Sequence, residues 1–158
     1  MPLLLLKVNR LSAVFWDVDG TLADTEMDGH RPAFNLAFQE LDLPFVWDEA
    51  LYNRLLAIPG GLRRVKLHAE TCGVHLSQNQ LDQVRDRKRV HYMERVRQGH
   101  VHLRPGVKRL LQELSSAGVQ QWIVTSSGSA SVMALLEQIQ KQIPSFDGVV
   151  TSDDVAMG

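Results

Sequence analysis

The sequence predicts an α/β fold with an all-helical insertion, and three observations support this. Short apolar runs typical of buried strands end at residues 16, 124 and 150. The second and third runs each follow a helical pattern, an order typical of a parallel sheet. Between the first two runs, residues 28–100 show helical periodicity only. The chain of 158 residues is 44% hydrophobic and 22% charged, a composition that excludes a disordered or collagen-like protein.

The first strand and the insertion can be placed from local patterns. Residues 11–16 are rich in β-forming side chains and end at Asp17, ahead of the turn-forming pair Asp19-Gly20. The sequence pattern of the insertion predicts four helices. The first carries an apolar face at i, i+3, i+4 and i+7 and stops before Pro44, and the second is capped by Asp48. The third covers about residues 62–71, and the fourth is longer, with an apolar stripe of Leu81, Val84, Tyr92, Met93 and Val96, to which Lys88 is expected to add its aliphatic stem.

The pattern changes near Pro105, which suits the first turn of a helix that Gly118 ends. Residues 119–124 predict a strand, and a further helical stripe runs from Val132 until Pro144. A last short strand covers residues 146–150. These elements, with the insertion after the first strand, complete a βαβ pattern.

Composition and charge exclude several classes of partner. With 17 Lys and Arg against 18 Asp and Glu, the net charge of −1 offers no global field for nucleic acid or an anionic membrane. Six basic residues between Arg85 and Arg97 are interpreted as a solvated helix face. The single Cys72 favours a reducing compartment, and the leucines at 3–6 are too few for a signal peptide or membrane span. We therefore expect a cytoplasmic protein, or a plastid stromal one in a photosynthetic eukaryote.

The strongest chemical signal is the pair Asp17 and Asp19, two residues apart directly after the first strand. Carboxylates at the carboxyl end of a parallel strand face the crevice where α/β sheets bind ligands. Such a pair can hold a hard cation, and one member can attack a phosphoryl group while the other handles protons. An Asp-x-Asp-Gly sequence on its own is also compatible with a turn that merely ends a strand.

Two segments resemble the motifs of the haloacid dehalogenase (HAD) superfamily. Asp17-Val18-Asp19-Gly20-Thr21-Leu22 resembles its first motif, and Trp122-Ile123-Val124-Thr125-Ser126 resembles its second. The resemblance implies a HAD Rossmann-like core of residues 1–27 and 101–158, with an incomplete parallel sheet, and an inserted all-α helical cap of residues 28–100.

The insertion further resembles the CbbY subgroup, which hydrolyses sugar phosphates. This rests on the following residues: Ala23-Asp24-Thr25-Glu26, His30-Arg31, Ala33-Phe34-Asn35, Trp47-Asp48, Tyr52, Gly60-Gly61 and Arg64. The resemblance implies a Mg²⁺-dependent phosphatase acting on a small sugar phosphate or bisphosphate, such as xylulose 1,5-bisphosphate, through an aspartyl-phosphate.

The resemblance also assigns roles to individual residues. Asp17 is expected to be the nucleophile and Asp19 the acid and base, and both are expected to hold Mg²⁺, Asp19 through its main-chain carbonyl. Thr125 and Ser126 are expected to hold the transferring phosphoryl group. His30 and Arg64 are expected to contact the substrate, with Arg63 as an alternative to Arg64.

Two alternatives remain open at this stage. A phosphomutase resembling β-phosphoglucomutase uses the same residues but returns the phosphoryl group to a sugar. The sequence ends at Gly158, where the third-motif lysine of the family would come next, so a non-catalytic fragment is the other alternative. Asp153 and Asp154 precede that lysine in the family, outside its expected metal shell. We expect the chain as given to be catalytically impaired, with residues 13–16 at a sheet edge unless residues 3–8 cover it. The sequence predicts no oligomeric state.

Overall fold

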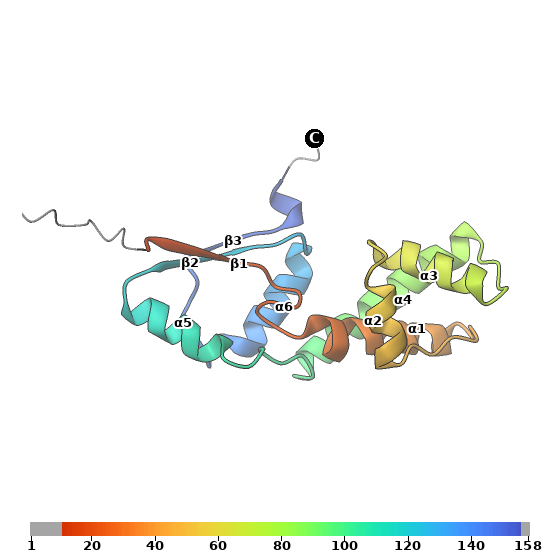
Figure 1. Cartoon of the computed structure of the whole chain (residues 1–158), viewed down its shortest axis with the longest axis horizontal. Helices are drawn as coiled ribbons and strands as arrows, with labels where there is room; N and C mark the ends of the chain where they lie inside the picture. Colours follow the sequence, from red (N-terminus) through yellow and green to blue (C-terminus); the bar gives the residue numbers. More distant parts are fainter. Residues whose placement is uncertain (1–10, 156–158) are drawn as a thin grey trace, which may run out of the picture.

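A computed structural model describes residues 11–155, and its elements form two lobes side by side (Figure 1). The sheet lobe contains the three strands with helices α5 and α6. The helical lobe contains helices α1 to α4. The predicted α/β fold with a helical insertion after the first strand is therefore confirmed.

The sheet consists of β1 (Ala13–Trp16), β2 (Gln120–Val124) and β3 (Gly148–Val150), in that spatial order. Both pairings are parallel, with Phe15 opposite Trp122 and Ile123 opposite Val149. Because all three strands run the same way, their carboxyl ends lie at one edge of the sheet. The loops after β1 and β2 are therefore neighbours.

One face of the sheet is covered by α5 (Val107–Ser116) and α6 (Ser129–Ile139) (Figure 1). Trp16 and Ile123 are buried, whereas Phe15, whose side chain alternates to the other side of β1, is 68% exposed. Within residues 11–155, β1 is an edge strand, as predicted. The predicted covering segment, residues 3–8, lies outside the described residues.

The helical lobe contains the four helices that the apolar stripes predict: α1 (Arg31–Glu40), α2 (Glu49–Leu55), α3 (Gly61–Thr71) and α4 (Gln78–Arg97). The Asp48 side chain caps α2 by accepting a hydrogen bond from the Leu51 amide at 2.7 Å, which confirms the predicted start of this helix. Ser77 and Gln80 form a capping box at the start of α4.

Two local features differ from the sequence analysis. A six-residue π-helix, η1 (Thr25–His30), joins the loop after β1 directly to α1, where no helix was expected. Pro105 lies outside α5, because Gly106 adopts a left-handed φ of +86° and the helix begins only at Val107. Both differences arise where the chain passes between the lobes; at η1 the buried Gly29 lies against the Tyr92 ring of α4.

Helix α4 links the two hydrophobic clusters of the molecule. Leu81 and Val84, near its start, belong to the cluster of the helical lobe. Tyr92 and Val96, near its end, belong to the cluster of the sheet lobe. One rigid helix therefore sets how the lobes sit against each other. Among the helices of residues 11–155, none combines the length and apolar character needed to cross a membrane.

Candidate active site

The loop after β1 presents the two aspartates differently. Asp17 is exposed, and its carboxylate accepts no hydrogen bond from the part of the chain that the structure describes. Gly20 turns the backbone with a φ of +71°, and its amide donates to the Ala23 carbonyl at 3.0 Å. The compact turn after Asp17 thus leaves that carboxylate free at the carboxyl end of β1.

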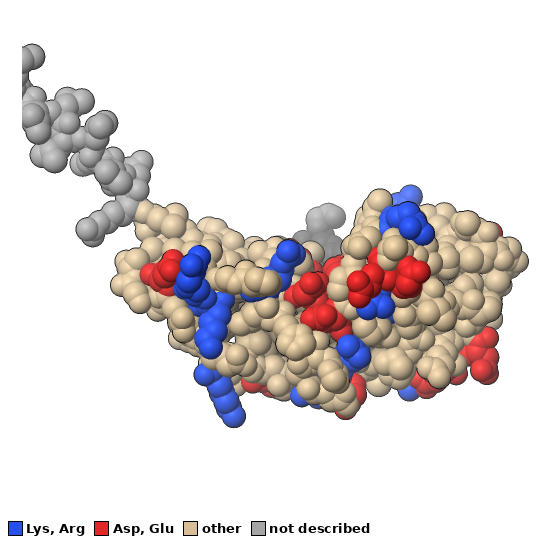
Figure 2. All heavy atoms as spheres, turned by 60° about the horizontal axis from the view of Figure 1, so that its bottom comes forward, with Lys and Arg blue, Asp and Glu red and all other residues tan. Residues whose placement is uncertain are grey.

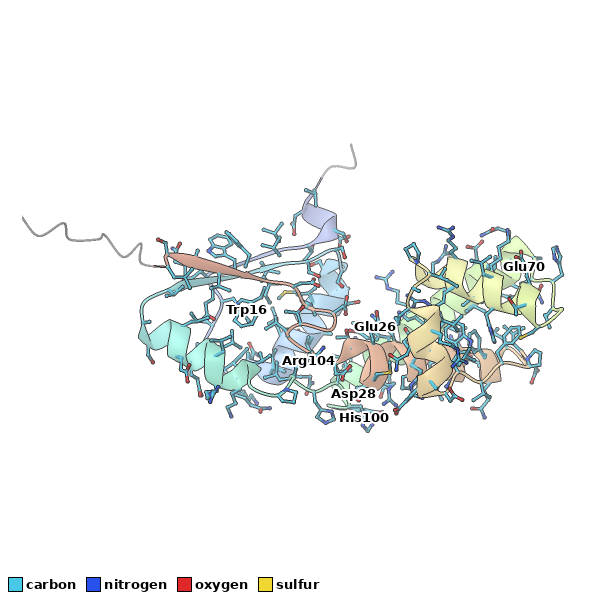
Figure 3. All side chains as sticks on the ribbon, viewed as in Figure 1. Trp16, Glu26, Asp28, Glu70, His100 and Arg104 are labelled. Carbon is cyan, nitrogen blue, oxygen red and sulfur yellow. The ribbon has the colours of Figure 1, made fainter. Side chains whose placement is uncertain are left out.

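The segment before α5 braces this loop. The Arg104 guanidinium donates a hydrogen bond to the Gly20 carbonyl, and the Arg104 amide donates to the Leu22 carbonyl at 3.0 Å. Figure 3 shows Arg104 beside the loop, between the lobes. The Asp24 amide donates to the His102 carbonyl, also at 3.0 Å. These contacts fix the conformation of the loop, and they come from residues about eighty positions later in the chain.

Asp19 is held between two side chains. The Ser127 hydroxyl donates to Oδ2 of Asp19, and Nε2 of His30 lies 3.6 Å from Oδ1. Burial raises the pKa of the Asp19 carboxyl, but hydrogen bonding by the His30 imidazole and by the Ser127 hydroxyl outweighs it and holds the pKa well below its ordinary value. Asp19 is therefore ionised at neutral pH in this arrangement.

His30 connects Asp19 to α4. Its Nδ1 lies 3.0 Å from the Lys88 ammonium, so Nδ1 accepts and Nε2 carries the proton toward Asp19. The His30 ring also packs against the Tyr92 ring, with 4.3 Å between centroids. Burial lowers the pKa of Lys88 to about 8, only partly opposed by the charges of Glu26 and Asp19. A chain of polar contacts thus runs from the first-motif loop into the helical lobe.

The second predicted motif follows β2, beside the end of β1. Thr125 is buried; its amide donates to the Val150 carbonyl at 3.0 Å, and its hydroxyl oxygen accepts from the Ser127 amide at 3.2 Å. Ser126 is exposed. The structure therefore brings the Thr125–Ser126 segment to the same sheet edge as Asp17, with Thr125 shaping the loop.

Arg64 lies inside the helical lobe and is only 8% exposed. Its Nε donates to the Leu55 carbonyl at 3.0 Å and its Nη1 to the Tyr52 hydroxyl at 3.3 Å. The Tyr52 hydroxyl in turn donates to Glu26 of η1 at 2.6 Å. This network ties α3 and α2 to η1, whereas Arg63 is exposed.

The structure shows which side chains are available to bind a divalent cation. Figure 2 shows acidic side chains gathered where the two lobes meet. Among residues 11–155, no group of three or more His, Cys, Asp or Glu converges as a metal site. Asp153 instead accepts from the Ser129 amide, and Asp154 from Thr151. Because Mg²⁺ is commonly held by one or two carboxylates with water and phosphate oxygens, the free Asp17 carboxylate fits part of such a shell.

Sequence analysis missed Ser127, a direct partner of Asp19, and Lys88, a partner of His30. Ser127 directly follows the second motif, two residues beyond Thr125, but nothing local distinguishes it from Ser126. Lys88 was expected to contribute only its aliphatic stem to the apolar stripe and to belong otherwise to a solvated basic face, whereas its ammonium reaches His30. The signal that could have found it is its place on α4 one turn before Tyr92, on the buried side of the helix.

The fold is an α/β sheet with two carboxylates in the loop after its first strand and a helical insertion that follows this loop. The sequence of residues 14–158 matches the family of haloacid dehalogenase-like hydrolases, so the chain belongs to this family. It is 42% identical over 133 residues to the plasmid-encoded protein CbbY of Cupriavidus necator, a match covering 80% of this chain and 52% of that protein.

Solved structures agree with this assignment. The crystal structure of CbbY from Rhodobacter sphaeroides in complex with phosphate is similar, with a TM-score of 0.71 and 29% identity over 93% of this chain and 66% of that one. A mutant of the same protein in complex with xylulose-(1,5)bisphosphate gives a TM-score of 0.70 at 28% identity. The chain spans about half the length of the Cupriavidus relative.

Proposed function

We propose that the protein is a Mg²⁺-dependent phosphatase that acts on a small phosphorylated sugar through an aspartyl-phosphate. The observation that supports it best is the contrast between the two aspartates at one strand end. Asp17 is exposed and unbonded within the described residues, as a nucleophile requires, while Asp19 is held by Ser127 and His30. The similarity to CbbY supports a sugar phosphate as the substrate.

In the proposed reaction, an Asp17 carboxylate oxygen attacks phosphorus in line, and the bond to the sugar oxygen breaks. Water then attacks the aspartyl-phosphate, which releases inorganic phosphate and regenerates Asp17. Thr125 and Ser126 would hold the phosphoryl oxygens, since their loop lies beside the end of β1. The Asp17 carboxylate and the Asp19 main-chain carbonyl would hold Mg²⁺, which neutralises phosphoryl charge when bound.

Asp19 would donate a proton to the leaving sugar oxygen and then accept one from the attacking water. In the present arrangement its pKa is depressed by His30 and Ser127, which favours the base form. The acid role therefore requires Asp19 to leave these two partners and take up a proton before the sugar departs. We propose that substrate binding loosens the Ser127 hydrogen bond.

The helical lobe would act as a cap that excludes water and selects the substrate. This assigns residues 28–100 to the cap, and residues 1–27 and 101–158 to the core. His30 would contact the substrate from the linker, where its side chain is 18% exposed. Arg64 would do so only after breaking its contacts to Leu55 and Tyr52, so the exposed Arg63 remains the alternative.

The test is release of phosphate from xylulose 1,5-bisphosphate by the purified protein with Mg²⁺, together with trapping of the phosphorylated enzyme. Asp17→Asn should abolish both, with unchanged circular dichroism. Asp24→Asn, a neighbouring acid in the same loop, is the matched control. Turnover that survives in Asp17→Asn contradicts the proposal. So does a result in which neither the chain as given nor a version extended through the third-motif lysine hydrolyses sugar phosphates or becomes phosphorylated. Transfer of phosphate to a second sugar would identify a phosphomutase instead.

A further inference from the structure

A pocket lies where the chain returns from the helical lobe to the sheet lobe. It has a volume of about 360 Å³, and its walls come from the returning segment, the start of α5 and the end of α6. Its polar lining residues are His102, Arg104, Lys108, Gln138 and Gln142. Neither Asp17 nor Asp19 lines it, so this pocket is separate from the candidate active site.

The charge around this pocket is positive. Arg104 and Lys108 supply two cations, and no Asp or Glu of the described residues lines the pocket. Neither cation forms an ion pair with the part of the chain that the structure describes, whereas Arg109, the next residue of α5, is paired with Glu113 at 3.6 Å. The positive end of the α5 dipole and the negative end of the α6 dipole oppose each other here. The two side-chain charges therefore decide the potential, which attracts an anion.

The other polar side chains add hydrogen-bond donors. Gln138 and Gln142 each carry an amide NH₂ group. Nδ1 of His102 lies 2.9 Å from Oδ2 of Asp28 and donates to this carboxylate, which leaves Nε2 for a ligand. A guanidinium, an ammonium and amide N–H groups around one volume match the oxygen atoms of a phosphate group. The volume is near the lower end of the range for small-molecule sites, so it suits a small phosphorylated anion.

The wall of the pocket is joined directly to the first-motif loop. The Arg104 amide donates to the Leu22 carbonyl at 3.0 Å, and the Arg104 guanidinium donates to the Gly20 carbonyl. Figure 3 shows Arg104 beside this loop, between the lobes. Because Arg104 also lines the pocket, an anion that binds its guanidinium competes with the Gly20 carbonyl, one residue after Asp19.

We propose that this pocket binds a small phosphorylated anion, and that binding shifts the first-motif loop by drawing the Arg104 guanidinium away from the Gly20 carbonyl. Inorganic phosphate and a phosphate monoester share the group that the pocket recognises. The anion acts as an effector, because it binds outside the residues assigned to the reaction. Whatever binds at the loop then changes the affinity of the pocket by the same factor. Binding depends only on the pocket residues, so it holds whether or not Asp17 is a nucleophile.

Amide NMR titrations with inorganic phosphate and with glycerol 3-phosphate test the site, at constant ionic strength and without Mg²⁺ so that the ester is not consumed. The amides of Gly99 and Gly106 report the pocket, and the amide of Ser126 reports the candidate phosphoryl site. Lys108→Gln should raise the Kd read at Gly106 about tenfold and leave the Kd read at Ser126 within about twofold. Arg109→Gln removes the neighbouring cation outside the pocket and is the matched control, which should change neither Kd by more than about twofold.

The amide of Gly20 should follow the same saturation curve as Gly106 and lose that response in Lys108→Gln. Tighter binding of the ester than of phosphate assigns the pocket to monoesters, and binding of the ester that is no tighter assigns it to free phosphate. The site is refuted if the Gly106 response saturates with neither anion, or if Lys108→Gln and Arg109→Gln weaken binding equally. A Gly20 response that follows Ser126 instead refutes the coupling to the first-motif loop.

Discussion

The Ser127 hydroxyl donates a hydrogen bond to Asp19, which joins two loops that are 108 residues apart in the sequence. Ser127 follows β2 and Asp19 follows β1, and these strands are adjacent in the sheet. The parallel register brings both loops to one edge, so the hydrogen bond is a direct consequence of the topology. It makes the protonation of Asp19 dependent on the position of the second loop.

Removing the Ser127 hydroxyl should weaken this link. Hydrogen bonds to charged groups stabilise proteins by about 1.5–3 kcal/mol, and Asp19 is partly exposed, so Ser127→Ala should cost about 1–2 kcal/mol. Urea denaturation at pH 7 measures it. Ser126→Ala, an exposed serine next in sequence, should change stability by less than about 0.5 kcal/mol. Equal losses in the two variants would show that the hydrogen bond contributes nothing specific.

The depressed pKa of Asp19 predicts the direction of the acid response. Above pH 3.8, the ordinary pKa of this group, Asp19 is ionised in both the folded and the unfolded protein, and its contribution to stability is complete. As the pH falls below 3.8, the unfolded chain takes up the proton first, so this contribution is lost. Stability should therefore fall more steeply from about pH 4 to pH 2 in the unsubstituted protein than in Asp19→Asn. Parallel plots of Tm against pH for the two proteins would contradict this prediction.

Lys88 predicts a rise in stability at alkaline pH. Its pKa is lowered from 10.5 to about 8, so between these values the unfolded chain binds the proton more tightly. Stability should rise across this range as the buried charge is removed, by up to about 3 kcal/mol relative to Lys88→Met. Urea denaturation of both proteins at several pH values measures the difference. Lys108→Met, which removes an exposed lysine of α5, is the matched control, and an equal rise there would refute the assignment to Lys88.

Gly29 of η1 packs closely against the ring of Tyr92. A Cβ atom at this residue would lie 2.7 Å from Cε2 of Tyr92, and that ring is 3% exposed and cannot move freely. Gly29→Ala should therefore destabilise the protein by about 1–3 kcal/mol and disturb the His30 ring that packs on Tyr92. The double variant Gly29→Ala/Tyr92→Leu should recover much of the loss. If Gly29→Ala alone left the Tm unchanged, η1 would be able to shift without a loss of stability.

Much of the fold was predictable because its signals are local. Helices α1 to α4 were placed by apolar stripes, and α2 by its Asp48 cap, since both depend on residues within a few positions. Asp17 and Asp19 were assigned to a strand end for the same reason. The π-helix was not predicted, because its packing against Tyr92 depends on a residue more than sixty positions away.

The sequence alone determined the order of strands and helices, the two carboxylates after β1 and membership of a recognisable family. Only the tertiary structure decided that Ser127 and His30 hold Asp19, that Arg64 is buried against Leu55 and Tyr52, and that the cations of α4 face the start of α6. The physical reason is the range of the interactions. Periodicity and capping act over a few residues, whereas burial, pKa and pocket walls depend on side chains that meet only when the sheet and α4 have assembled.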